Sequence, residues 1–353
     1  MLGLNEVVVY RQLCGLTLLL AVAGLVVGCW ANPLNNSPPT MQPAQPAVSP
    51  PVSQNPAGAV RPLGGHPQAA LFDGSTRQLV VLDPEANPAG PASISLFGHD
   101  GQRPPRAIVL PRPAIALTCD GRGIAYLASR GGYVTVDLSS GRVTQVSVAD
   151  TPNIEYTAIA RRADGKMVLG SADGAVYTLN ASDSGSASVA NRNKIFARVD
   201  ALVTQGNTTV VLDRGQTSVT TIGADGHTEQ ALRAGLGATT LTADPLGRLL
   251  VADTRGGQLL VYGVDPLILR QAYPVRGAPY GLAGSRQLAW VSQTASNMVI
   301  GYDLSTGIPV EKVRYPTVQQ PNSLAFDEES DTLYVVSGSG AGVQVIEHAA
   351  GIP

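Results

Sequence analysis

A repeat of about 42 residues runs through the chain from residue 58 to its end. Its clearest copy, residues 322–347, has apolar runs at 323–326, 333–336 and 343–346, separated by turn residues. Such runs are typical of strands joined by tight turns, and a single meander needs neighbours to bury its faces. The first turns of seven such units lie 47, 44, 42, 38, 40 and 43 residues apart, at Asp73, Asp120, Asp164, Gly206, Asp244, Gly284 and Asp327.

This spacing predicts an all-β protein, a seven-bladed β-propeller of four-stranded antiparallel blades over residues 58–353. The 39 glycines and 26 prolines agree with a chain that turns often. A β-sandwich ranks second, because it would not show so regular a cycle. The last unit lacks a fourth strand. We therefore predict that residues 59–63 pair with residues 343–346 and close the ring by joining the two chain ends.

The N-terminus differs in composition from the repeats. An apolar run at 13–27 follows Arg11 and ends in Val26, Val27, Gly28 and Cys29. This ending resembles the lipobox of bacterial lipoproteins, although Val26 and Val27 depart from the more usual residues. The resemblance implies a signal peptide over residues 1–28 and a lipid-modified Cys29. A plain secretory signal or an uncleaved anchor is the alternative.

Residues 29–57 are polar and contain eight prolines between Pro33 and Pro56. We expect them to form a flexible, semi-extended tether that holds the folded domain away from a membrane. With Cys14 in the signal peptide and Cys29 lipidated, only Cys119 remains, so the mature domain has no internal disulfide. We expect Cys119 to be a small buried hydrophobe.

Three strand pairs resemble the repeat of YVTN-type propellers. They are 333–337 with 343–346, 288–292 with 299–304, and 124–129 with 134–138. Over essentially its full length the chain resembles the LppL lipoproteins of mycobacteria. Three features carry this resemblance: the lipobox, the Pro-rich residues 42–51 and propeller-repeat sequence such as residues 200–207. The resemblance implies a lipoprotein of the cell envelope, lipid-anchored on the extracytoplasmic side of the membrane. It brings no catalytic motif with it.

The composition gives little indication of chemistry. A formal charge of −2 offers no electrostatic case for nucleic acid. We find no phosphate-binding loop, no metal-ligand spacing and no nucleophile elbow. We therefore expect no cofactor and no metal. The four histidines fall in predicted loops: His66, His99, His227 and His348. Asp137, Asp253, Asp265 and Asp303 recur near strand ends, where a carboxylate bonds to turn backbone.

Propeller geometry supplies the candidate site. The innermost strand of each blade lines the central channel, so the residues at the starts of these strands should form one rim. Such a mixed polar set could hydrogen-bond a polar ligand, but the same side chains could equally cap strands. The rim candidates are Arg112, Tyr156, Asp200, Thr239, Tyr280 and Asn322, with His66 as a seventh position.

Our interpretation favours a membrane-anchored, monomeric binding or scaffold module without catalytic activity. Its partner would be an envelope protein or a polar ligand at the rim. One alternative is a propeller enzyme, such as a lactonase-like metal-dependent hydrolase, for which Asp200 and Asn322 are available ligands. Glu155 is the nearest further carboxylate. Another alternative is an envelope-assembly factor, which would expose an apolar patch.

Overall fold

The predicted propeller is confirmed in a computed structural model of the chain, which describes residues 38–84, 92–99, 101, 103–180 and 185–351. One compact unit spans Pro39–Pro353. The predicted signal peptide and Cys29 lie outside the described residues. No helix in the described part of the chain is long and apolar enough to span a membrane.

Seven antiparallel sheets follow one another along the chain, and we number them as blades 1 to 7. Blade 1 comprises β2 (Ala69–Asp73), β3 (Gln78–Asp83), β4 (Ser93–Gly98) and β5 (Arg106–Val109); blade 2 comprises β6 (Ala116–Cys119), β7 (Ile124–Ser129), β8 (Gly132–Asp137) and β9 (Val143–Val148). Blade 3 comprises β10 (Tyr156–Arg161), β11 (Met167–Ser171), β12 (Ala175–Leu179) and β14 (Val189–Lys194); blade 4 comprises β15 (Ala201–Gln205), β16 (Thr208–Asp213), β17 (Ser218–Ile222) and β18 (Thr228–Arg233).

The remaining blades have the same order of strands. Blade 5 comprises β19 (Ala238–Ala243), β20 (Arg248–Asp253), β21 (Gln258–Val264) and β22 (Leu267–Pro274); blade 6 comprises β23 (Pro279–Gly284), β24 (Ala289–Gln293), β25 (Met298–Asp303) and β26 (Val310–Pro316). Blade 7 comprises β27 (Pro321–Asp327), β28 (Thr332–Ser337), β29 (Val343–Ile346) and, from the other end of the domain, β1 (Ala59–Arg61).

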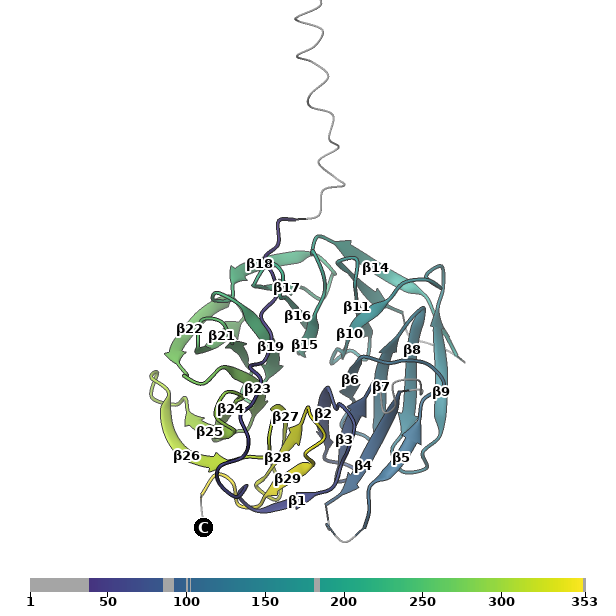
Figure 1. Ribbon diagram of the computed structural model, residues 1–353. Helices are drawn as coiled ribbons and strands as arrows, with labels where there is room; N and C mark the ends of the chain where they lie inside the picture. Colours follow the sequence, from purple (N-terminus) through teal and green to yellow (C-terminus); the bar gives the residue numbers. More distant parts are fainter. Residues whose placement is uncertain (1–37, 85–91, 100, 102, 181–184, 352–353) are drawn as a thin grey trace, which may run out of the picture. The chain divides into compact units, whose positions relative to one another are not determined.

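The first strand of each sheet stands at the centre of the ring (Figure 1). These strands are β2, β6, β10, β15, β19, β23 and β27. Each of them begins at the same end of the ring, which faces the viewer in Figure 1. We call this end the front face. It also carries the loops between the second and third strands of each blade. The first turns of the blades lie at the opposite end, the back face.

The predicted closure of the ring is confirmed. β1 runs antiparallel to β29, with Ala59 opposite Val345 and Arg61 opposite Val343. The strand is shorter than the predicted 59–63 and stops before Pro62, which has no N–H to give to a ladder. Because β1 belongs to the start of the domain and β29 to its end, this pairing joins the two ends of the ring.

Seven apolar clusters hold the blades together, one at each interface between neighbours. The middle strands show how. On β20, Leu249 and Val251 pack toward blade 4, while Leu250 and Ala252 pack toward blade 6. All four are fully buried. A strand with both faces buried reads as a continuous apolar run, which is the pattern of the repeat.

One strand was not expected from the repeat. The insertion after β12 contains β13 (Ser186–Ala187), which pairs in parallel with β9 and extends the sheet of blade 2. Ser186 lies opposite Ser147, and Ala187 opposite Val148. Strand pairing through this insertion thus joins blade 3 to blade 2.

The predicted tether needs a correction in its described part. Residues 39–57, which we call the strap, do not stand free but lie along the front face of blades 4 to 7 (Figure 1). The compact unit accordingly starts at Pro39 rather than at residue 58. The reason is a series of polar side chains on the blades that satisfy the strap's backbone groups. They come from Arg214, Arg255, Thr294, Asn297, Gln319 and Gln320.

Candidate functional site

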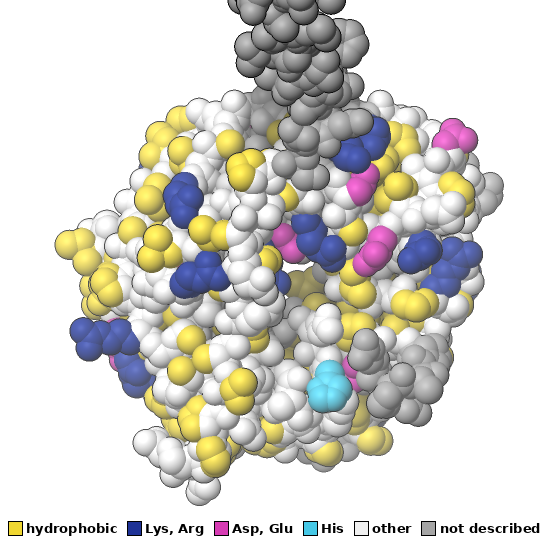
Figure 2. All heavy atoms as spheres, turned by 45° about the horizontal axis from the view of Figure 1, so that its top comes forward, with side chains coloured by type: hydrophobic (Ala, Val, Ile, Leu, Met, Phe, Trp, Pro, Cys, Tyr) yellow, Lys and Arg dark blue, Asp and Glu magenta, His cyan; other side chains and the backbone are white. Residues whose placement is uncertain are grey.

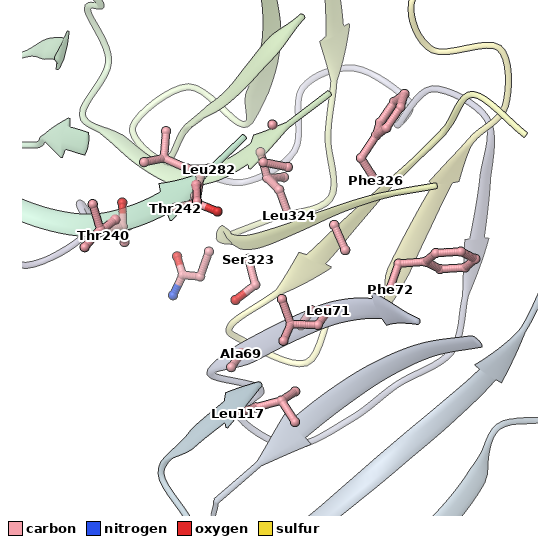
Figure 3. A pocket seen from close by; sticks show the side chains of 18 of the residues that line it. Ala69, Leu71, Phe72, Leu117, Thr240, Thr242, Leu282, Ser323, Leu324 and Phe326 are labelled. Carbon is pink, nitrogen blue, oxygen red and sulfur yellow. The ribbon is translucent and has the colours of Figure 1, made fainter. Parts of the chain in front are cut away.

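A cavity of about 330 Å³ opens at the centre of the ring, lined by strands of blades 1, 2, 5, 6 and 7 (Figure 3). Leu71, Leu117 and Leu282 give it aliphatic walls, and Thr240 and Ser323 add hydroxyl groups. In Figure 3, Phe72 and Phe326 point away from the open centre. No charged side chain occurs among the described residues that line the cavity. Its size suits a small molecule, and its lining suits an uncharged one.

Two of the inner strands that line this channel, β23 and β27, approach each other closely. A Cβ on Gly281 would lie 2.9 Å from the carbonyl oxygen of Asn322 and 2.8 Å from the Ser292 hydroxyl. The Gly281 N–H donates to that hydroxyl at 2.8 Å, and the same hydroxyl donates to the Pro321 carbonyl at 2.6 Å. Glycine at this position therefore lets β23 approach β27 closely.

The ends of the second strands fix the front-face loops in a repeated way. Asp83, Asp213 and Asp253 are buried and accept backbone N–H groups from the segment that leads into their own blade. Blades 2, 3 and 7 place a serine here, and blade 6 places Gln293. Ser337, for example, donates to the Gln319 carbonyl at 2.6 Å. The predicted structural role is confirmed for Asp137, Asp253 and Asp303, which all accept N–H groups of nearby turns.

Of the predicted rim residues, Asn322 lines the cavity. Its Oδ1 accepts a hydrogen bond from Gln320 Nε2 at 3.0 Å. Thr239 is buried inside blade 5, where its hydroxyl donates to the Ala252 carbonyl at 3.2 Å. The neighbouring residue, Thr240, lines the cavity instead. The front end of the channel therefore carries one predicted residue and one that was missed by a single position.

Sequence reasoning missed Arg214, whose backbone N–H binds Asp200 and whose charge acts on Tyr280. Asp200 accepts the Arg214 N–H at 2.7 Å and lies 3.3 Å from Arg198 Nε. Burial raises the pKa of the Asp200 carboxyl, although both arginines act against this shift. Burial also raises the pKa of Tyr280, again against the charge of Arg214. Arg214 is thus the positive centre of a polar cluster beside the channel.

Arg214 also binds the strap, since its guanidinium donates to the Ala44 carbonyl. Farther along, the Ala47 N–H donates to the Thr294 hydroxyl at 3.1 Å, and the Ser49 hydroxyl donates to the Thr294 carbonyl at 2.6 Å. Gln320 donates to the Ala47 carbonyl at 2.9 Å and accepts the Ser49 N–H at 3.0 Å. The strap therefore borders the front end of the channel beside Asn322.

Arg112 and Tyr156 lie away from the channel, in a second cavity of about 450 Å³ between blades 2 and 3. Tyr156 is buried; its hydroxyl donates to Thr151 at 2.9 Å, and its ring meets Tyr177 edge-on. Burial raises the pKa of Tyr156 to about 12. Exposed Glu155 lines this second cavity too. The seven rim positions thus do not form one funnel.

The cysteine and the histidines that the sequence analysis considered lie outside the central cavity. Cys119 packs against the cluster between blades 1 and 2, and burial raises the pKa of its thiol well above the usual range. His66, His99, His227 and His348 all lie outside strands, as predicted. No group of three or more metal-ligating His, Cys, Asp or Glu side chains occurs within the described ranges.

No protein-family model and no curated protein matches the chain. Solved structures match it as a fold. It is similar to virginiamycin B lyase from Staphylococcus aureus, at 12% identity and a TM-score of 0.66 over 82% of this chain and 98% of that one. It is also similar to a chain of the mitotic checkpoint complex, at 11% identity and a TM-score of 0.68 over 89% and 99%. It is similar as well to a chain of Kuenenia stuttgartiensis hydrazine synthase, at 14% identity and a TM-score of 0.64 over 83% of this chain and 98% of that one.

These identities show the fold alone, and the activities of the matching proteins do not carry over. By class, the protein is a seven-bladed β-propeller of four-stranded antiparallel blades, closed by strands from both ends of its domain.

Proposed function

We propose that the chain is a cell-envelope lipoprotein, held on the extracytoplasmic side of the membrane by a lipid on Cys29, and that its propeller is a non-catalytic binding module. The lipobox-like residues 26–29 support the anchor, as does the resemblance to LppL lipoproteins with YVTN-type repeats. Replacing Cys29 with alanine should release the protein from membranes. Retention of the variant in the membrane fraction would contradict the lipid anchor.

The binding function depends on one observation, the uncharged cavity at the centre of the ring. Its aliphatic walls, its hydroxyl groups and the amide of Asn322 suit a small, uncharged ligand with both polar and apolar parts. The hydrolase alternative would require carboxylate ligands in the channel. The described residues that line the cavity include no Asp or Glu, and Asp200 is ion-paired with Arg198 and accepts the backbone N–H of Arg214.

Native mass spectrometry of the detergent-extracted full chain tests this function. We expect a bound small molecule on the wild type and none on Ser323→Phe, because a phenyl ring at this position would fill the cavity. Ser305→Phe, in an exposed back-face turn, is the matched control and should keep the ligand. Equal occupancy in all three proteins, or no bound mass on the wild type, would contradict a ligand site in the channel.

The envelope-assembly alternative required exposed apolar surface, and the outer strands of blades 5 and 6 carry some. Ile268 and Leu269 on β22 are 47% and 42% exposed, and Ile308 and Val310 near the start of β26 are 68% and 40% exposed. Gln271 of β22 donates to the Leu304 carbonyl at 3.2 Å, which joins the two blades here. This patch is the observation that supports a protein partner as a second candidate.

A further inference from the structure

The front face and the back face differ in charge. Exposed arginines outnumber the exposed carboxylates of the front face, which are Asp150, Glu155 and Asp173 (Figure 2). The arginines are Arg112, Arg130, Arg198, Arg255 and Arg276. The turns of the back face carry both signs. Their exposed or half-exposed carboxylates are Asp120, Asp137, Asp164, Asp225, Glu328, Glu329 and Asp331, and their exposed arginines are Arg103, Arg106, Arg122, Arg142 and Arg286. A surface of positive potential attracts anionic lipid, whereas a surface of negative potential is repelled by it.

Aliphatic side chains stand exposed on the same face as these arginines. Val48 of the strap is 91% exposed and Val52 is 42% exposed, although both lie in a segment held against the blades. Leu236, in the link between blades 4 and 5, is 56% exposed. Arg255 joins Leu236 to the strap, since its guanidinium donates to the Leu236 carbonyl and contacts the Met41 sulfur, each at 3.3 Å. Apolar side chains set among basic ones are typical of surfaces that bind at a lipid interface.

The start of the strap is the point from which the N-terminal residues leave the domain. The first backbone contact is at blade 4, where the Met41 N–H donates to the Gly215 carbonyl at 2.9 Å. Cys29 precedes Pro39 by ten residues, so an extended chain would span at most about 35 Å between them. A lipid on Cys29 would therefore keep the domain close to the bilayer, and the strap that carries this attachment lies on the front face.

We propose that the front face is a membrane-docking surface for anionic lipid, with Val48 and Leu236 at the lipid interface and the arginines against the headgroups. This inference rests on the proposed lipid anchor. The front end of the channel then faces the bilayer. The back face, where both charges are mixed, points away from the membrane and is the surface open to soluble partners.

Site-specific fluorescence on the lipidated full chain tests the orientation. In a Cys119→Ser background, a polarity-sensitive probe is attached at Val48→Cys or at Val310→Cys. The second position is an exposed valine near the back end of β26 and serves as the matched control. The proteins are placed in vesicles of phosphatidylcholine and phosphatidylglycerol that contain nitroxide-labelled lipid. We expect at least twofold stronger quenching at position 48 than at position 310.

Equal quenching at the two positions in membrane-bound protein would overturn the docking surface and leave the lipid anchor intact. A chain that fails to bind the vesicles at all would instead overturn the anchor. Vesicles of phosphatidylcholine alone test the arginines, and quenching at position 48 should fall there. Unchanged quenching without anionic lipid would overturn the role given to the arginines. Thermal unfolding of each labelled variant shows that the ring is intact.

Discussion

The ring and the strap belong to one compact unit, but different interactions stabilise them. Between blades, whole strands such as β20 bury apolar side chains on both faces. Along the strap, Ala44 and Ser49 are buried while Val48 is almost fully exposed, and the contacts are hydrogen bonds to side chains or backbone groups of single residues. Apolar burial stabilises in proportion to area, whereas a hydrogen bond contributes about 0.5–1.5 kcal/mol net. The strap should therefore detach more easily than a blade unfolds.

The largest expected effect lies in the ring. Trp290 of β24 is fully buried between blades 6 and 7, and its ring stacks on Phe326 with centroids 5.7 Å apart. Trp290→Ala should lower the free energy of unfolding by about 3–5 kcal/mol, because it leaves a large cavity in the interface. Urea denaturation measures this loss.

The control is Trp290→Phe, which keeps most of the ring volume. The indole Nε1 has no hydrogen-bond partner in the described structure, so its removal leaves no backbone group unpaired. We expect Trp290→Phe to retain most of the stability. A wild-type urea midpoint for Trp290→Ala would show that this interface contributes little to holding the ring together.

The next effect concerns the junction where the strap ends and the ring closes. Gln344 of β29 is fully buried. Its Nε2 donates to the carbonyls of Ala57 and Pro316 at 2.7 and 3.0 Å, and its Oε1 accepts the Val318 N–H at 3.1 Å. Gln344→Leu removes all three bonds. The Pro316 carbonyl still accepts the Ala57 N–H at 3.0 Å, but the Ala57 carbonyl and the Val318 N–H lose the Gln344 side chain, which should cost about 2–3 kcal/mol of unfolding free energy.

Differential scanning calorimetry measures this second effect as a lower melting temperature. Val60→Ala, at an exposed position of β1 directly opposite Gln344, is the control and should change stability by less than about 0.5 kcal/mol. If both variants had the melting temperature of the wild type, Gln344 would not be a determinant of ring closure.

The difference between ring and strap also explains why the blades could be predicted from the sequence and the position of the strap could not. Apolar runs recur in every blade because every blade buries both faces, so the repeat predicted the blades and their number. Closure followed from the missing fourth strand of the last unit. The strap gave no such signal. Its Pro-rich composition is typical of unpacked chain, and its partners, such as Arg214 and Gln320, are single polar residues on different blades.

The rim prediction failed for a reason that can be located on the strands. Several inner strands begin with a register irregularity, as between Tyr156 and Ala158 on β10 and between Ala238 and Thr240 on β19. Such an irregularity changes which side chain faces the channel. Thr240 therefore lines the cavity while Thr239 turns into the blade. Apolar spacing does not reveal a local shift of this kind, so the strand could be predicted and its facing residue could not.

The smallest expected effect lies in the strap, and it tests the comparison most sharply. Gln320→Ala removes two hydrogen bonds to the strap, at Ala47 and Ser49, and one to Asn322. We expect a loss of only about 1 kcal/mol in unfolding free energy, because the freed strap groups can turn to water. Hydrogen exchange should be faster at the Ser49 amide, with β24 unchanged.

Gln319→Ala is the control for this last variant, because the Gln319 side chain makes one bond to the strap, to the Ser49 carbonyl at 3.2 Å. It should accelerate exchange less than Gln320→Ala does. If Gln320→Ala instead accelerated exchange equally in the strap and in β24, the two regions would open as one cooperative unit. Residues 39–57 would then be part of the ring's stability, and the distinction between burial in the blades and hydrogen bonding along the strap would not describe how the domain unfolds.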